Sequence, residues 1–188
     1  KSIMGLKTYI LTNHISKIQF FTFHFRLLKI NYSRRDVVNS TLRSYLCNMK
    51  LRQVDLVDIN KFSENTLMQV LGMKCIEIGD DFIRVRMPVD KRTHQPMGLL
   101  HGGASAALIE TIGSIGSTLL LDLEKEVPVG LEVNANHVGG ISEGNVVALG
   151  KIVHAGKRTH LWQVNITNEE TGKLICTGRL TIMIIPRP

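Results

Sequence analysis

The sequence is poor in cysteine and aromatic residues and has no long apolar segment. Its three cysteines, Cys47, Cys75 and Cys176, form no CxxC pair, and their odd number leaves at least one unpaired. This usage argues against a zinc site or a disulfide framework and is typical of the reducing cytoplasm. No apolar run approaches the ~20 residues of a transmembrane helix, so we expect no membrane partner. A GxSxG motif is missing too, so a serine-hydrolase mechanism has no support.

The net positive charge comes from one end of the chain. The formal net charge is +7 over 188 residues. Residues 1–48 contain eight Lys or Arg and a single acid, Asp36. Residues 49–188 contain the remaining fifteen basic and fifteen acidic residues, so this part is neutral overall. A neutral region offers no basic face to nucleic acid, and we expect no nucleic-acid partner.

Residues 1–48 differ from the rest in more than charge. They hold four of the six Phe residues and keep neither the period of a helix nor that of a strand. Met49 resembles a natural start, and we expect residues 1–48 to be a non-native or weakly ordered extension without a part in chemistry. Organelle targeting is the alternative, because basic, acid-poor segments are typical of it. We expect the functional domain to span residues 49–188.

The hydrophobic pattern from Met49 onward predicts an α+β fold. Apolar residues at helical spacing predict a short helix over 58–71, and a second, longer helix is predicted from Gly103 to about Leu121. Strands are predicted on either side of a turn at 79–81 and at 127–137, 146–154, 160–167 and 174–185. Short turns join the later strands, so we expect one antiparallel sheet with the long helix on its inner face.

Glu110 is the one charged residue in the predicted long helix. Burying an unpaired carboxylate costs several kcal/mol, so its presence needs a reason. Its neighbours on the helix face are all small, which leaves room beside the carboxylate: Gly103, Ala106, Ala107, Ser114 and Ser117. This arrangement indicates a pocket wall with one reactive group. A solvent-exposed Glu on a face that contacts another helix is the alternative.

His101-Gly102-Gly103 stands where the long helix begins. A helix N-terminus offers unpaired backbone N–H groups, and glycine lets a carbonyl oxygen approach them closely. This is the geometry of an oxyanion hole in acyl transfer. Glu110 lies seven residues beyond Gly103, which is ~10 Å along a helix axis. Either the substrate spans that distance or a second chain supplies half of the site.

The segment HQPMGLLHGGASAALIETIGS, residues 94–114, resembles the active-site motif of the hotdog-fold acyl-CoA thioesterases. The similarity covers about residues 60–184 and continues through MPVDKRTHQP, GLEVNANHV and GRLT. It is greatest to the subgroup of phenylacetate-pathway and 4-hydroxybenzoyl-CoA enzymes, near the 1,4-dihydroxy-2-naphthoyl-CoA and enterobactin proofreading thioesterases. The resemblance implies a curled antiparallel sheet around the long helix, and a homodimer or homotetramer with active sites across the dimer interface.

The resemblance also implies roles for particular residues. Glu110 of one subunit acts as the nucleophile or as the general base that activates water. Facing it from the other subunit, the Gly102 N–H and Gln95 polarise the thioester carbonyl, and His101 positions the thioester or its leaving thiol. Ser114 is implied to line the acyl pocket or to hold the water, and His137 to lie near the acyl group. The alternatives are a capping role for His101, a packing role for Ser114 and a backbone hydrogen bond for His137.

Lys157, Arg158 and Thr159 lie in a predicted turn. In the family the matching loop is near the nucleotide end of CoA, where basic side chains meet phosphates. A merely solvated basic turn is the alternative.

We therefore interpret the chain as an acyl-CoA thioesterase without metal or cofactor. VGLEVNANHV and Ile115, which follows Ser114, favour 1,4-dihydroxy-2-naphthoyl-CoA and hence menaquinone biosynthesis. One alternative is a proofreading thioesterase that takes its substrate from an acyl carrier protein. Another is a non-catalytic acyl-CoA-binding regulator, although residues 1–48 lack the periodicity of a DNA-binding helix pair. A hotdog hydratase is disfavoured because its Asp/His pair is not found.

Overall fold

The computed structural model describes residues 50–188, and the predicted extension at 1–48 lies outside the described residues. Three helices and six strands follow in the order α3 (Leu56–Lys61), α4 (Leu67–Leu71), β1 (Lys74–Ile78), β2 (Phe82–Pro88), α5 (Gly102–Thr118), β3 (Glu126–His137), β4 (Asn145–Ala155), β5 (Thr159–Asn168) and β6 (Leu174–Pro186). None of the helices in this part of the chain has the length and apolar character needed to cross a membrane.

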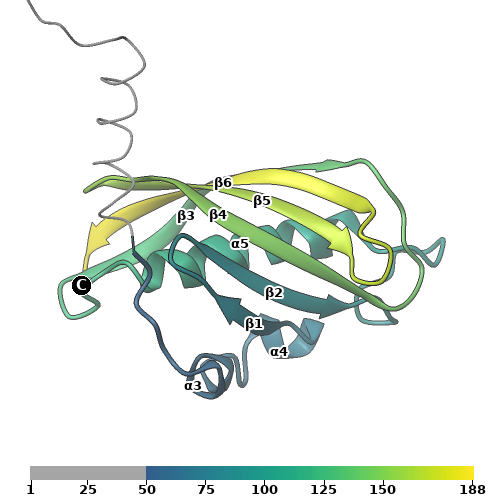
Figure 1. Ribbon diagram of the computed structural model, residues 1–188, viewed down its shortest axis with the longest axis horizontal. Helices are drawn as coiled ribbons and strands as arrows, with labels where there is room; N and C mark the ends of the chain where they lie inside the picture. The colour runs from purple at the N-terminus through teal and green to yellow at the C-terminus, as the bar shows by residue number, and fades with distance from the viewer. Residues whose placement is uncertain (1–49) are drawn as a thin grey trace, which may run out of the picture. The chain divides into compact units, whose positions relative to one another are not determined.

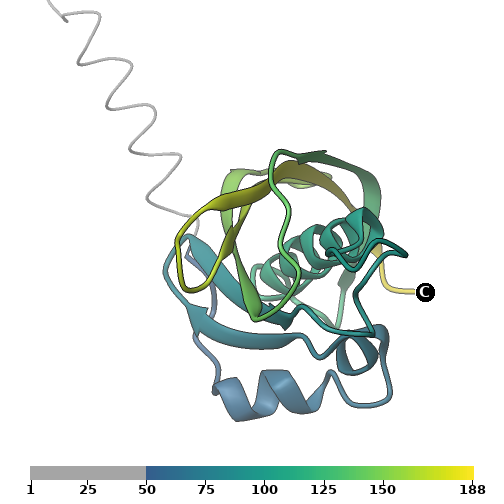
Figure 2. The ribbon, with the colours of Figure 1, turned by 90° about the vertical axis from the view of Figure 1, so that its right-hand side faces the viewer.

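The six strands form a single antiparallel sheet in the order β1-β2-β4-β5-β6-β3. The sheet curls around α5, which lies along its inner face (Figures 1 and 2). The predicted α+β class and all six strands are thereby confirmed. The order leaves β1 and β3 as the two edge strands.

Small residues on α5 let the helix lie close to the sheet. A Cβ added at Gly116 would lie 2.5 Å from Cζ2 of Trp162, and one added at Gly113 would lie 3.2 Å from Cδ1 of the same indole. Trp162 itself is fully buried. Leu108, Ile109 and Ile112, also on α5, are fully buried as the pattern predicts. The core is therefore the space between α5 and the concave face of the sheet.

The prediction of one helix over 58–71 is wrong, because the segment forms two short helices. Asn65 adopts the left-handed conformation with φ of 60°, which ends any continuous helix there. Thr66 then stands at the N-cap of α4, and Gly72 ends α4 in the left-handed conformation. The Asn60 side chain exchanges two hydrogen bonds of 2.9 Å with the backbone of Cys75, which fastens α3 to β1.

Ser117 does not share the open face of Glu110, contrary to the prediction. It is fully buried, because β5 covers this end of α5. The indole N–H of Trp162 donates to Ser117 Oγ at 2.9 Å, and Nδ1 of His160 lies 3.0 Å from the same oxygen. Since an indole can only donate, Ser117 accepts that bond and has its own proton to donate to a neutral His160. Burial, aided by the charge of His154, lowers the pKa of His160.

The free energy of unfolding is expected to decrease as the pH is lowered from 6.5, which is the ordinary pKa of histidine. The native state disfavours the protonated ring, so the unfolded state binds more protons as the pH falls from that value to the lowered native pKa. His160→Gln removes the titrating group. The free energy of unfolding of this variant should therefore fall less steeply with pH than that of the unsubstituted protein, with a difference of up to about 1.4 kcal/mol per pH unit. Urea unfolding of both proteins between pH 5 and 8 measures the difference. Parallel curves would contradict the assignment.

Candidate active site

His101 caps the N-terminus of α5. Its Nδ1 accepts a hydrogen bond of 2.8 Å from the Gly103 N–H. Because Nδ1 accepts, the proton of the neutral ring is on Nε2. The capping role that was an alternative for His101 is therefore present, and it leaves an Nε2–H donor on an exposed ring.

Gly102, the first residue of α5, carries an unused donor. Among residues 50–188 no group accepts a hydrogen bond from its N–H. The imidazole of His137 lies directly over it, since a Cβ at residue 102 would be 2.8 Å from His137 Nε2. A side chain at residue 102 would therefore have to displace the His137 imidazole. His137 comes from the end of β3 and is exposed.

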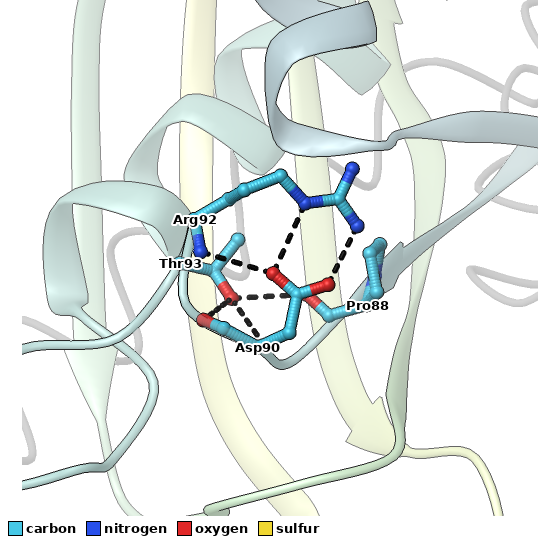
Figure 3. A network of polar contacts seen from close by, with 4 residues as sticks. All are labelled: Pro88, Asp90, Arg92 and Thr93. Atoms are coloured by element: carbon cyan, nitrogen blue, oxygen red, sulfur yellow. Dashed lines mark hydrogen bonds and ion pairs between the residues drawn. The ribbon is translucent and has the colours of Figure 1, made fainter.

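The loop between β2 and α5 is held by a polar network (Figure 3). Thr93 is buried, and its hydroxyl binds the backbone of Pro88 and Asp90. The Arg92 guanidinium binds the Asp90 carboxylate at 2.6 and 3.0 Å and, chiefly through this hydrogen bonding, lowers the pKa of Asp90 to about 2. Thr93 O in turn accepts the His101 N–H at 2.8 Å, which ties the loop to the start of α5.

Gln95 lies within this loop, next to the start of α5. His94 pairs with Leu100 across the loop, and the Gln95 N–H donates to Leu99 O at 2.8 Å. Gln95 Oε1 accepts a hydrogen bond from the Met97 N–H, which orients the side-chain amide. The Nε2 protons of Gln95 have no acceptor among residues 50–188. We call Gln95, His101, Gly102 and His137 the polarising half-site, for the role proposed for it, which is to donate hydrogen bonds to a carbonyl oxygen.

The carboxylate of Glu110 lies on the middle of α5, half-buried and without an ion-pair partner in the described part of the chain. The Ser114 hydroxyl donates to Glu110 Oε1 at 3.3 Å. On its other side the carboxylate lies against Gly130 of β3, where an added Cβ would be 2.8 Å from Glu110 Cδ. We call Glu110, Ser114 and Gly130 the carboxylate half-site.

The two half-sites of one chain do not meet. Gly102 and Glu110 are on the same helix, eight residues apart, which is ~12 Å along its axis. The basic turn is more distant still from Gly102. Lys157 and Arg158 are exposed, and His160, just after the turn, contacts Ser117 near the far end of α5.

A cavity of about 850 Å³ opens beside Ser114. Its floor is the second half of α5, including Ser114 and Ile115, and apolar residues of the α3–α4 segment close the other side. Its lining residues are Arg52, Val54, Asp58, Ile59, Lys61, Phe62, Ser63, Met68, Ser114, Ile115, Thr118, Leu119 and Leu123. His137 does not line it and lies with Gly102 instead.

Some contributors were not among the residues singled out from the sequence. Gly130 had a signal, because an isolated glycine inside a strand often marks a bulge or the close approach of another group. The anchors Thr93, Asp90 and Arg92 had none, because their roles come from hydrogen bonds within an irregular loop. No cluster of His, Cys, Asp or Glu that could hold a metal ion occurs in residues 50–188.

Comparison with known proteins shows which family the chain belongs to. Residues 97–175 match the family model described as thioesterase superfamily. The chain is 45% identical to a 1,4-dihydroxy-2-naphthoyl-CoA hydrolase of Escherichia coli over 71% of its own length and 97% of that protein. It is 42% identical to the putative esterase PA1618 of Pseudomonas aeruginosa over 70% of its length and 90% of that protein.

A solved structure agrees with this relationship. The crystal structure of a mutant of the thioesterase PA1618 from Pseudomonas aeruginosa superposes with a TM-score of 0.72 at 40% sequence identity. The match covers 74% of this chain and 99% of that chain. The chain therefore belongs to the thioesterase superfamily, with the hotdog fold, and is an enzyme that hydrolyses thioesters.

Proposed function

We propose that the enzyme hydrolyses an aromatic acyl-CoA at active sites that two copies of the chain build together. The observation that carries this proposal is the separation of the two half-sites along α5. Each half-site has what the other lacks: one offers hydrogen-bond donors to a carbonyl oxygen, and the other offers a carboxylate. Two helices that lie antiparallel across a two-fold axis would bring Glu110 of one copy to Gly102 of the other.

The polarising half-site would stabilise the negative charge that develops on the thioester oxygen. The Gly102 N–H and the Gln95 amide are both unpaired donors in the described part of the chain. Preorganised donors of this kind stabilise the transition state because they need no reorientation as charge develops. The Nε2–H of His101 would donate to the sulfur as the C–S bond breaks.

Glu110 supplies the other half of the chemistry, in one of two ways. Its carboxylate can attack the carbonyl carbon, release the CoA thiolate and form an anhydride that water then hydrolyses. Alternatively it takes a proton from water, and the resulting hydroxide attacks the same carbon and expels the CoA thiolate. The Ser114 hydroxyl orients Oε1 in either case.

Edge strand β3 supports a second copy as the partner that completes the site. It is 12 residues long and carries three exposed apolar side chains, Val129, Leu131 and Val133. An exposed, apolar edge strand of this length readily pairs with another chain. Antiparallel pairing of two β3 strands would extend the sheet across the two-fold axis and align the α5 helices.

The cavity beside Ser114 supports an aromatic acyl group. Its lining is predominantly apolar, and its volume of about 850 Å³ has room for a bicyclic ring. The identity to the E. coli 1,4-dihydroxy-2-naphthoyl-CoA hydrolase favours that substrate, and with it a role in menaquinone biosynthesis. Lys157 and Arg158, which are exposed, and Thr159, which is half-buried at the start of β5, are proposed to bind the phosphates of CoA.

Glu110→Gln is expected to lower kcat for thioester hydrolysis by at least about 10³-fold while substrate binding persists, because the amide is neither nucleophile nor base. Thiol release from naphthoyl-, benzoyl-, phenylacetyl- and long-chain acyl-CoA measures activity and ranks the acyl group. Glu170→Gln is the matched control, since Glu170 is exposed in a hairpin turn. Full activity of Glu110→Gln would refute the assignment. Turnover restricted to thioesters of an acyl carrier protein would show that this protein, and not CoA, carries the acyl group.

Mixed copies test the shared site directly. Glu110→Gln and Gln95→Ala damage opposite half-sites, so each homodimer should be nearly inactive. A mixed dimer has one site with both changes and one with neither. Unfolding and refolding an equimolar mixture should therefore restore about a quarter of the unsubstituted activity. Activity no greater than the mean of the two variants would show that each chain works alone.

A further inference from the structure

We propose that Gly130 is a positioning residue for Glu110. The missing side chain at residue 130 leaves a space that the Glu110 carboxylate occupies, and the backbone of β3 then limits where the carboxylate can point. This inference rests on the proposed function, because it explains why a catalytic carboxylate takes one position.

The three heavy atoms nearest to the space at Gly130 all belong to the Glu110 carboxylate. A Cβ added there would lie 2.8 Å from Cδ and 2.9 Å from Oε2 of Glu110, and nearer still to Oε1. Real Cβ atoms essentially never come within 3.0 Å of another heavy atom, so an alanine would displace the carboxylate. The backbone does not itself demand glycine, because Gly130 is not among the glycines with positive φ in the described residues.

A bulge in β3 turns Gly130 toward the helix. Gly130 pairs with Ile182 and Glu132 pairs with Thr181, so Leu131 is the extra residue. Paired residues on neighbouring strands point to the same face, and the side chain of Ile182 is fully buried beneath the sheet. The residue 130 position therefore faces α5.

The same register explains how one strand serves both half-sites. His137 pairs with Cys176, which is also fully buried, so residue 137 faces α5 as well. Residues 130 and 137 are an odd number apart and would face opposite sides in a regular strand. The bulge restores a common face. One strand thus brings Gly130 to Glu110 and His137 to Gly102.

Few other contacts fix the carboxylate. The Ser114 hydroxyl lies 3.3 Å from Oε1, a long hydrogen bond, and there is no ion pair to Glu110 within residues 50–188. Gly130 of β3 also lies against the carboxylate. An added methyl group would therefore shift the end of a flexible side chain, which costs the fold little and the chemistry much.

Gly130→Ala is expected to lower kcat about 100-fold, since a misplacement of ~1 Å has that effect on catalysis. KM, the thermal midpoint and the molar mass from light scattering should stay close to those of the unsubstituted protein. Gly140→Ala is the matched control: its φ is not positive, and its Cβ would make an ordinary contact of 3.6 Å with Leu99. It should keep full activity.

The Glu110→Gln background separates positioning from a general structural role. If Gly130 acts through Glu110, adding Gly130→Ala to Glu110→Gln lowers the residual rate no further. An equal fall in both backgrounds overturns the inference, and so does full activity of Gly130→Ala beside an inactive Glu110→Gln. If Gly130→Ala fails to fold, adding Glu110→Ala should restore folding, and continued failure also overturns it.

A crystallographic comparison keeps the inference separate from the proposed function. If the unsubstituted protein hydrolyses none of the thioesters in the panel, the proposed function fails. The position of the carboxylate in crystals of the unsubstituted protein and of Gly130→Ala still tests the contact. A carboxylate that moves away from residue 130 supports the inference, and an unmoved one overturns it.

Discussion

Helix α5 lies inside the curl of the sheet, and where it approaches Trp162 most closely its residues are small. Glycines at 113 and 116 bring the helix against the indole of Trp162, and Ser117 accepts the hydrogen bond of that indole. Each interior glycine costs ~1 kcal/mol of helix propensity relative to alanine. Tertiary packing must offset that cost, so the helix and the sheet depend on each other for their stability.

This helix also sets the distances within the site. It begins at Gly102, where a histidine cap and an anchored loop fix the unpaired N–H, and it carries Glu110 two turns later. A rigid helix keeps these groups apart, so a substrate carbonyl cannot meet both within one copy. In the proposed two-fold assembly the same rigidity is useful, because equal helices would hold both composite sites at equal geometry.

The sequence predicted those parts of the structure that depend on local patterns. Alternation and turn residues located all six strands, and His101-Gly102-Gly103 located the start of α5. The split between α3 and α4 was missed because it depends on the left-handed Asn65 and on the binding of Asn60 to β1. Ser117 was assigned to the wrong surroundings because helical spacing does not reveal which strand covers the far end. The cavity beside Ser114 depends on the packing of the α3–α4 segment, which no local pattern encodes. The roles assigned to individual site residues stay predictions.

The bulge at Leu131 limits how the chain can change in length. Within β3, deleting or inserting one residue between Gly130 and His137 would turn one of them away from α5 and spoil one half of the site. Between α5 and β3 the chain has no alternation of faces to keep, so a change of one residue in 119–125 would leave the relative facing of Gly130 and His137 unaltered. Natural or engineered length variation is therefore expected in that connection and in the hairpin turns, and not in the second half of β3.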